Sequence, residues 1–364
     1  MGYRLRMRTL PFLLLGLAVS ASAQTRPAAS AAACTSATPA CTEWVALGGG
    51  PARSLIYRSR PLDARNGNIR RALIMVHGTN RNADHYFSTA MTAAFLAGAL
   101  GDAIVISPRI ASAAGSCKDT LAANEVSWSC TGDSWRSGGA AASHPDLSSF
   151  DFVDAILRKL ANKAMFPNLR AIVVAGHSAG GQFVARYQMA NPIHDALGVP
   201  ITYVVANPSS YAWPDATRPL AAGDATPENA KGAWEIEKPH TNFSYGAFDA
   251  ATCPAYDRWP AGLENRTGGY TAKTDDAQLK QQLVSRPTTF LLGQVDTLPL
   301  GGFDSSCPAM AQGATRRARG EAYVKYINET LGAKHAIQIV PECGHNDRCV
   351  YTTDSVLPLV FPQP

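Results

Sequence analysis

One serine lies in a pattern that packing alone does not explain. The stretch GHSAG at residues 176–180 has the form G-x-S-x-G and joins an apolar run at 171–175 to a helical pattern over 178–190. A serine between a buried strand and a helix, flanked by residues with minimal side chains, can be raised out of a sheet in a sharp turn. It then lies at the positive end of the helix, where developing negative charge is stabilised. We therefore expect Ser178 to be a nucleophile.

A nucleophilic serine needs a base to take its proton and an acid to orient that base. His345 follows the apolar run 336–340, and Asp296 follows an earlier apolar run. Together with Ser178 they keep the chain order serine, acid, histidine that accompanies a strand–turn–helix nucleophile. We expect His345 to be the base and Asp296 the acid. Asp304, further along the same loop, is the alternative acid.

Acyl transfer also needs hydrogen-bond donors for the oxyanion of its transition state. The run LIMVHGTN at 73–80 reads as a strand that ends in His-Gly, upstream of the serine. We expect the backbone N–H groups of Thr79 and Ala179 to be these donors. One such donor is typically worth roughly 3 kcal/mol in the transition state. His77 and His177 are expected to support the two loops structurally.

Short apolar runs alternate with helical patterns along most of the chain. Strands are predicted at 54–58, 72–76, 103–107, 171–175, 201–206, 288–292 and 336–340, and helices at 86–100, 147–165, 178–190 and 309–331. Near-continuous apolar strands separated by helices indicate an α/β fold, with a mostly parallel sheet covered by helices on both faces. Functional groups in such sheets gather at the carboxyl ends of the strands, which suits the three candidates.

Two long segments, 110–145 and 207–286, interrupt this alternation and hold candidate substrate-binding residues. The insertion 207–286 is rich in Gly, Pro and aromatic residues, and segments of this length are uncommon unless they are lids or binding segments. We expect the insertion to form a lid or a pocket wall over Ser178. A pocket for an apolar or aromatic acyl group would be lined by aromatic residues of the two segments, namely Trp128, Trp135, Tyr211 and Trp213. Ordinary core positions are the alternative for each.

The first residues have the layout of a secretory signal. Three arginines precede the apolar run 10–19, and small residues follow at 21–23. This pattern predicts a signal peptide over 1–23, too short to span a bilayer comfortably. Residues 24–42, rich in Ala, Ser and Thr, are expected to be flexible, and the folded domain to span 43–364. We therefore expect an exported protein, periplasmic or extracellular, without a membrane anchor.

The cysteines agree with an oxidising compartment. There are eight, and none forms a C-x-x-C pair of the kind that zinc sites use, so disulfides are the favoured use. They fall into the neighbouring couples Cys34 with Cys41, Cys117 with Cys130, and Cys343 with Cys349, leaving Cys253 and Cys307. Eight cysteines allow 105 connectivities, so the pairing stays open. For Cys343 and Cys349, which bracket His345, we do predict a bond.

The charge balance argues against nucleic acid as a partner. The formal net charge is +5, and loss of the predicted signal peptide removes three arginines and no acids. The remaining charge is close to neutral, and no cluster of Lys and Arg interleaves with aromatic residues. Nothing in the sequence indicates an oligomeric state.

The motifs together resemble the α/β-hydrolase fold family over about residues 50–360. The resemblance rests on VHG at 76–78, GHSAG at 176–180, Asp296, and GH at 344–345. It implies acyl transfer to water through an acyl-enzyme, with a small-molecule or polymeric ester as substrate and without a metal or an organic cofactor. More loosely, the chain is similar to secreted esterases and polymer-degrading hydrolases, including polyhydroxyalkanoate depolymerases and oxidised poly(vinyl alcohol) hydrolases. That narrower likeness rests on export, cysteines and insertions.

Three alternative functions are compatible with the same fold. The nearest alternative is a carbon–carbon hydrolase that cleaves β-diketones, as in oxidised polymers, with the same three residues. Peptide hydrolysis ranks lower because no charged specificity pocket is visible in the sequence. A non-catalytic binding module on a hydrolase scaffold is a different class. Such modules usually lack a member of the triad, whereas this chain keeps all three candidates.

Overall fold

The computed structural model describes residues 1–4, 33–130, 134–220, 243–266 and 269–363. The chain divides into two units, and the statements below concern the one that begins at Ala32. Most of the predicted signal peptide 1–23 and residues 24–32 of the predicted flexible segment lie outside the described residues. None of the helices in the described parts combines the length and the apolar character needed to cross a membrane.

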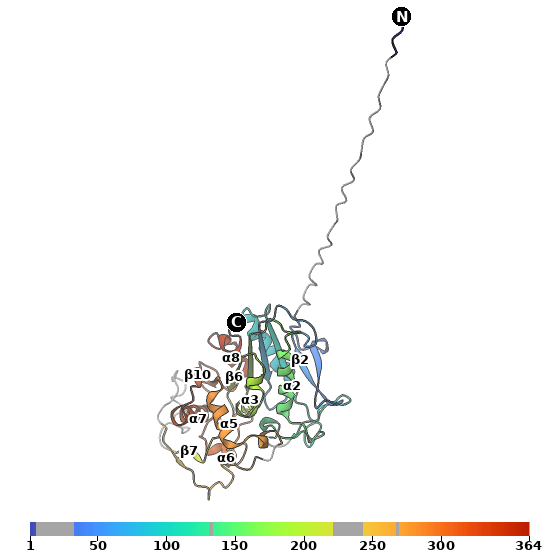
Figure 1. Ribbon diagram of the computed structural model, residues 1–364. Helices are drawn as coiled ribbons and strands as arrows, with labels where there is room; N and C mark the ends of the chain where they lie inside the picture. The colour runs from blue at the N-terminus through green and yellow to red at the C-terminus, as the bar shows by residue number, and fades with distance from the viewer. Residues whose placement is uncertain (5–32, 131–133, 221–242, 267–268, 364) are drawn as a thin grey trace. The chain divides into compact units, whose positions relative to one another are not determined.

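One sheet of eight strands organises the domain (Figure 1). Its strands lie in the order β1-β2-β4-β3-β5-β6-β9-β10, and those from β4 to β10 in this order pair in parallel. Within this sheet β2 pairs antiparallel with both of its neighbours, β1 and β4, and a separate antiparallel pair joins β7 Thr217–Pro219 to β8 Tyr245–Ala247. The bounds are β1 Thr42–Ala46, β2 Arg53–Arg58, β3 Arg71–Val76, β4 Ala103–Pro108, β5 Ala171–His177, β6 Ile201–Ala206, β9 Thr288–Gly293 and β10 Ala336–Val340. The predicted mostly parallel sheet is confirmed.

Helices cover both faces of this sheet, as predicted. They are α1 Ala83–Leu96, α2 Ser149–Ala161, α3 Ala179–Ala190, α5 Asp276–Ser285, α6 Cys307–Met310, α7 Arg316–Leu331, α8 Asp347–Thr352 and α9 Leu357–Val360. Alternate residues of each buried strand enter different cores because side chains alternate across a sheet. In β5, Ile172 and Val174 join the core under α2, α3, α5 and α7, whereas Val173 and Ala175 join the core under α1, α8 and α9.

Local signals explain where the helices begin and end. Ser148 and Asp151 form a capping box at the start of α2, in which each side chain accepts the other residue's backbone N–H. The prediction of one helix over 309–331 is wrong. Gly313, with φ of 140°, separates α6 from α7, and residues other than glycine rarely adopt that conformation.

The described end of the predicted flexible segment is attached to the sheet. Cys34 is bonded to Cys41, and its backbone N–H donates to the carbonyl oxygen of Ser59 at 2.8 Å. A short 3₁₀ turn at Pro39–Cys41 then leads directly into β1. Residues 33–42 therefore form part of the folded domain, which begins earlier than expected.

Candidate active site

A tight turn between β5 and α3 presents Ser178. Its backbone has φ of 59° and ψ of −120°, a conformation that a residue with a side chain adopts only under constraint. The constraint is a close approach of backbones. A Cβ at Gly176 would lie 2.3 Å from the carbonyl oxygen of Gly180, and one at Gly180 would lie 2.2 Å from that of Val76. Glycine at both positions lets α3 pack directly on β5 and β3.

The structure brings Ser178, His345 and Asp296 into one hydrogen-bonded chain. His345 Nε2 lies 2.9 Å from Ser178 Oγ, and His345 Nδ1 lies 2.8 Å from Asp296 Oδ2. An ionised carboxylate can only accept, so Nδ1 carries the proton and Nε2 is the acceptor for the serine hydroxyl. Such an arrangement can deprotonate the serine as it attacks.

The alternative acid lies elsewhere. Asp304 Oδ1 accepts the backbone N–H of Ser306 at 2.9 Å and so closes a local turn. Asp296, by contrast, is 3% exposed and lies in the loop after β9, which ends at Gly293. The geometry therefore selects Asp296 as the partner of His345.

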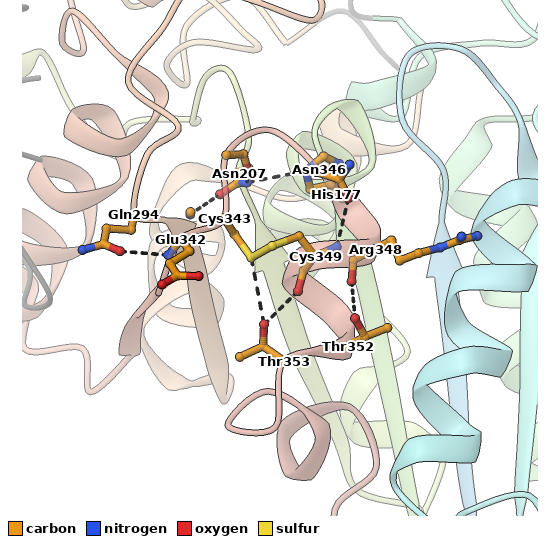
Figure 2. Close-up of a disulfide and its surroundings, with 12 residues drawn as sticks. His177, Asn207, Gln294, Glu342, Cys343, Asn346, Arg348, Cys349, Thr352 and Thr353 are labelled. Atoms are coloured by element: carbon orange, nitrogen blue, oxygen red, sulfur yellow. Dashed lines mark hydrogen bonds between the residues drawn. A yellow bond between two sulfur atoms is a disulfide. The ribbon is translucent and has the colours of Figure 1, made fainter. Parts of the chain in front are cut away.

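Direct hydrogen bonds join the loop after β9, which carries Asp296, to the loop after β10, which carries His345. We call these the acid loop and the histidine loop. The backbone N–H of Val295 donates to the carbonyl oxygen of Cys343 at 3.0 Å, and Gln294 Oε1 accepts the N–H of Glu342 at 2.8 Å. Figure 2 shows Gln294 and Glu342 beside the disulfide that closes the histidine loop. These contacts fix the spacing of the two loops.

Asn207, the first residue after β6, bridges the same two loops. Its Oδ1 accepts the N–H of Gly293 at 2.8 Å, and its Nδ2 donates to the carbonyl oxygen of Gly344 at 3.2 Å. Its φ is 45°, in the left-handed region that asparagine tolerates better than most residues. Sequence reasoning missed Asn207, although an asparagine at the carboxyl end of a parallel strand was a usable signal.

Arg316, in the first turn of α7, is the second residue that sequence reasoning missed. Its Nη1 lies 3.3 Å from Asp296 Oδ1, the carboxylate oxygen that does not face His345. The side chains of Arg316 and Asp296 are 0% and 2% exposed, so the pair is shielded from solvent. The available signal was three arginines in the first turn of one helix, which need partners because they oppose the helix dipole.

His77 holds the loop that carries Thr79. The N–H of Ile110 donates to His77 Nε2 at 3.1 Å, so Nδ1 is the protonated nitrogen and donates to the carbonyl oxygen of Gly78 at 2.9 Å. Burial lowers the pKa of His77 to about 4, which keeps the ring neutral. The expected structural role of His77 agrees with these contacts.

The two expected oxyanion donors flank the serine. Thr79 lines the same cavity as Ser178. Ala179 is the first residue of α3, and N–H groups in the first turn of a helix have no partner within that helix.

His177 lies below the ring of His345. The two ring centroids are 4.7 Å apart, and His177 Nδ1 lies 3.1 Å from Tyr86 Oη. Burial, followed by the nearby His345, holds the pKa of His177 well below its ordinary value. A neutral His177 adds no repulsive charge beside the histidine that must accept a proton.

A cavity of about 380 Å³ opens at Ser178 and His345. Its walls carry Asn80, Asn82 and the pair His85–Asp347, in which His85 Nε2 lies 3.0 Å from both carboxylate oxygens. Thr89 Oγ1 donates to the same carboxylate at 2.7 Å. The cavity is therefore mainly polar.

The four aromatic residues expected to line a substrate pocket belong to the core instead. Trp128, Trp135, Tyr211 and Trp213 are 1%, 3%, 0% and 0% exposed, and none of them lines the cavity at Ser178. Trp128 stacks on Phe152 of α2, and the Tyr211 ring centroid lies 4.5 Å from that of Tyr323 in α7. All four belong to the same buried apolar cluster, so the core alternative applies.

The described part of the insertion does not lie over the serine. No described residue of 207–286 lines the cavity; Gly301 and Gly302, from the loop after β9, form that wall. The insertion packs elsewhere: Arg186 of α3 donates to the carbonyl oxygen of Pro260, and Tyr270 donates to Asp154 of α2. The expected lid is therefore not found among these residues, and 221–242 lie outside the described part.

All eight cysteines are paired. The bonds join Cys34 to Cys41, Cys117 to Cys130, Cys253 to Cys307, and Cys343 to Cys349. The last closes the loop around His345, as predicted, and Figure 2 shows it at the start of α8.

Comparison with known proteins assigns this architecture to a family. A model of the alpha/beta hydrolase family matches residues 73–355, a span that includes the serine turn, the acid loop and the histidine loop. The chain belongs to the α/β-hydrolase family.

Two solved structures are similar to this chain in fold. Poly(aspartic acid) hydrolase-1 from Sphingomonas sp. KT-1 has 23% identity and a TM-score of 0.57 over 88% of this chain and 97% of its own. The poly(3-hydroxybutyrate) depolymerase LpqC from Bordetella parapertussis has 21% identity and a TM-score of 0.55 over 87% of each chain. At these identities the likeness concerns the fold. No curated protein matches the sequence significantly.

We predict that replacing both Cys343 and Cys349 by serine lowers turnover tenfold or more with a small fall in melting temperature. Closing so short a loop constrains the unfolded chain by only about 2 kcal/mol, whereas small displacements of His345 from the serine oxygen are costly. Ester turnover and thermal unfolding of the same preparation measure both effects.

The matched control is the double serine variant of Cys34 and Cys41, whose loop is of similar length and precedes β1 at the opposite edge of the sheet. It should keep its turnover. If both double variants lose turnover equally, the loss is not specific to the histidine loop. The disulfide would then not be needed for the geometry of that loop.

Proposed function

We propose that this protein is a secreted serine hydrolase that cleaves carboxylic esters through an acyl-enzyme. The observation that carries the proposal is the chain of hydrogen bonds from Ser178 through His345 to Asp296, at 2.9 and 2.8 Å. It is formed at the floor of a cavity large enough for a small acyl group. The family membership supports hydrolysis in general.

In this mechanism Ser178 Oγ attacks the ester carbonyl carbon while His345 Nε2 takes the hydroxyl proton. Asp296 holds the imidazole in the required tautomer and stabilises the imidazolium. The backbone N–H groups of Thr79 and Ala179 donate to the oxyanion. Collapse of the tetrahedral intermediate expels the alcohol, which takes the proton from His345. Water then repeats the sequence on the acyl-enzyme and releases the acid.

The surroundings of the cavity support a substrate with a small polar acyl part and an apolar continuation. Polar side chains line the cavity itself, whereas Leu298 and Leu300, in the loop that supplies Gly301 and Gly302, are 52% and 62% exposed. A short oligomer or polymer of a hydroxy acid has this character. The printed activities of the two similar structures, hydrolysis of poly(aspartic acid) and of poly(3-hydroxybutyrate), are in line with a polymeric substrate.

A β-diketone is the second candidate substrate. Cleavage of its carbon–carbon bond releases a ketone whose carbon must take up a proton, and its second carbonyl needs a hydrogen-bond donor. The His85–Asp347 pair on the cavity wall is a second group able to hold a proton near Ser178. Turnover of a β-diketone at a rate comparable to esters would favour this reaction.

Export is the remaining part of the proposal. It is supported by the layout of residues 1–23 and by the four disulfides of the described domain, which suit an oxidising compartment. Recovery of the processed protein from the periplasm or the medium, with a mature start near Gln24, is the direct test.

Ser178→Ala should abolish ester hydrolysis and leave folding intact, because the turn accepts a smaller side chain. We expect a loss of more than about a thousandfold. Mass spectrometry after treatment with a fluorophosphonate should show one adduct on the natural protein and none on the variant. A natural protein that takes no adduct would support the non-catalytic binding module.

Asp296→Asn should slow turnover by about a thousandfold or more without unfolding the protein, because an amide favours the wrong imidazole tautomer. The matched control, Asp304→Asn, changes a carboxylate of the same loop that closes only a local turn, and we expect a mild effect. Steady-state kinetics of the two variants compare them, and the reverse ranking would assign the acid to Asp304.

Leu300→Ser should raise KM for p-nitrophenyl octanoate and leave p-nitrophenyl acetate unaffected. Losing one partly buried leucine contact costs about 1 kcal/mol, or roughly a fivefold change. Leu96→Ser, an exposed leucine at the end of α1, serves as the control because it lies outside the loop that supplies Gly301 and Gly302. If both esters respond equally to Leu300→Ser, the loop does not contact the acyl chain.

A further inference from the structure

Arg316 makes three polar contacts that no part of the proposed mechanism uses. Its Nη1 faces Asp296 Oδ1 at 3.3 Å, its Nε donates to Ser209 Oγ at 2.8 Å, and its Nη2 donates to the carbonyl oxygen of Gly301 at 3.0 Å. One guanidinium therefore joins the acid of the triad, the segment after β6 and the loop that walls the cavity. The planar fork of arginine suits such a three-way contact, whereas lysine could not reproduce it.

The burial of Arg316 at the start of a helix is energetically unfavourable, which indicates that this residue has a role beyond packing. Arg316, Arg317 and Arg319 all lie buried in the first turn of α7, where positive charge opposes the helix dipole. Burial of a charge is also unfavourable without partners. Arg317 pairs with Glu321 within the helix, at 2.8 Å, and donates to the carbonyl oxygen of Gln294, also at 2.8 Å, without contacting the carboxylate of Asp296. Arg316 instead directs its charge at Asp296.

We propose that Arg316 is a positioning residue that fixes the catalytic acid and the cavity wall together. This inference rests on the proposed serine hydrolase function. The two carboxylate oxygens of Asp296 have different partners, Oδ1 facing Arg316 and Oδ2 facing His345. Rotation of the carboxylate would break both contacts, so the acid stays aligned with the imidazole.

The charge of Arg316 also acts on the proton of His345. Arg316 places a fixed positive charge behind Asp296, and that charge opposes a second positive charge on the imidazole. The charged and titratable groups facing Arg316 are Asp296, Asp304 and Arg319. Those around His345 also include His177, which is neutral, and Asp347 and His85 on the cavity wall.

The hydrogen bond from Arg316 to Gly301 connects the guanidinium to the loop that forms the cavity wall. Gly301 and Gly302 have φ of 58° and 69°, and a Cβ at Gly301 would lie 3.1 Å from His345 Cδ2. A Cβ at Gly302 would lie 3.4 Å from Thr79 Cγ2. The loop therefore contacts both the base and the expected oxyanion loop. Its carbonyl is held by Arg316, so the shape of the cavity depends on the same guanidinium as the acid.

Two substitutions separate the two roles. Arg316→Met removes both the charge and the hydrogen bonds, and Arg316→Lys keeps the charge but loses the fork. The controls are Arg319→Met and Arg319→Lys. Arg319 is one turn along from the start of the same helix, lies over the same Phe303 ring and donates to the carbonyl oxygens of Ser209 and Asp304 without contacting Asp296.

The experiment measures kcat and KM for p-nitrophenyl butyrate from acid to alkaline pH, with melting temperature, for the natural protein and the four variants. For Arg316→Met we expect kcat to fall tenfold or more and the acid limb of kcat/KM to move up by about one pH unit. For Arg316→Lys the limb should stay in place while KM rises severalfold. Both Arg319 variants should lower only the melting temperature.

A second measurement does not depend on turnover. Titration of the His345 ring, followed by NMR in the Ser178→Ala background, should show its midpoint moved upward by Arg316→Met and unmoved by Arg319→Met. Absence of hydrolysis in the natural protein would refute the proposed function and leave this titration as the test of Arg316. An acid limb and a titration both unchanged in Arg316→Met, with a lowered melting temperature, would overturn the proposal and leave Arg316 a structural residue.

Discussion

The close packing of α3 against β5 and β3 is the constraint on which the site depends. Backbone meets backbone at Gly176 and Gly180, where a single added carbon would lie within 2.3 Å of a carbonyl oxygen. This contact forces Ser178 into a conformation with φ of 59° and raises its side chain above the sheet. It also places the serine beside the end of β3, next to the loop that carries Thr79. The proposed nucleophile and the loop expected to hold the oxyanion are thus positioned by the same packing contact.

The parallel pairing of β9 with β10 positions the other two residues. Strands that end at the same edge bring the acid loop and the histidine loop together, and a set of short hydrogen bonds then fixes their spacing. Asn207 contacts both loops from the neighbouring strand β6. Strand β6 also pairs with β5. The loops that hold Ser178, Asp296 and His345 therefore all extend from neighbouring strands of one sheet, which fixes their relative positions.

The charges behind His345 come from Asp296 and Arg316, whereas two other histidines of the site are neutral. Burial keeps His77 and His177 neutral, each with a low pKa and with hydrogen bonds that suit the neutral ring. Asp296 supplies the negative charge that orients the imidazole, and Arg316 offsets that charge from behind. The two buried ions stabilise each other, which limits the cost of placing a carboxylate where it is 3% exposed.

The parts of the protein that could be predicted from sequence are those encoded locally. The strand–turn–helix pattern around Ser178, the run of apolar strands and the chain order of Ser178, Asp296 and His345 each follow from a short segment and its neighbours. The structure brings those three residues together. The helix boundaries were less accurate, because a single residue such as Gly313 ends or divides a helix through its backbone conformation.

Contacts between distant segments decided the rest. The aromatic residues of the two long segments could face either a pocket or the core, and the choice depended on which helices pack against them. Tyr211 and Trp213 pack against Tyr323 of α7, which lies more than a hundred residues later in the sequence, and are therefore core residues. The cavity wall at Gly301, the bridge made by Asn207 and the approach of Arg316 to Asp296 likewise join separate parts of the chain. Composition and periodicity describe each segment by itself, so partners chosen by tertiary packing are invisible to them.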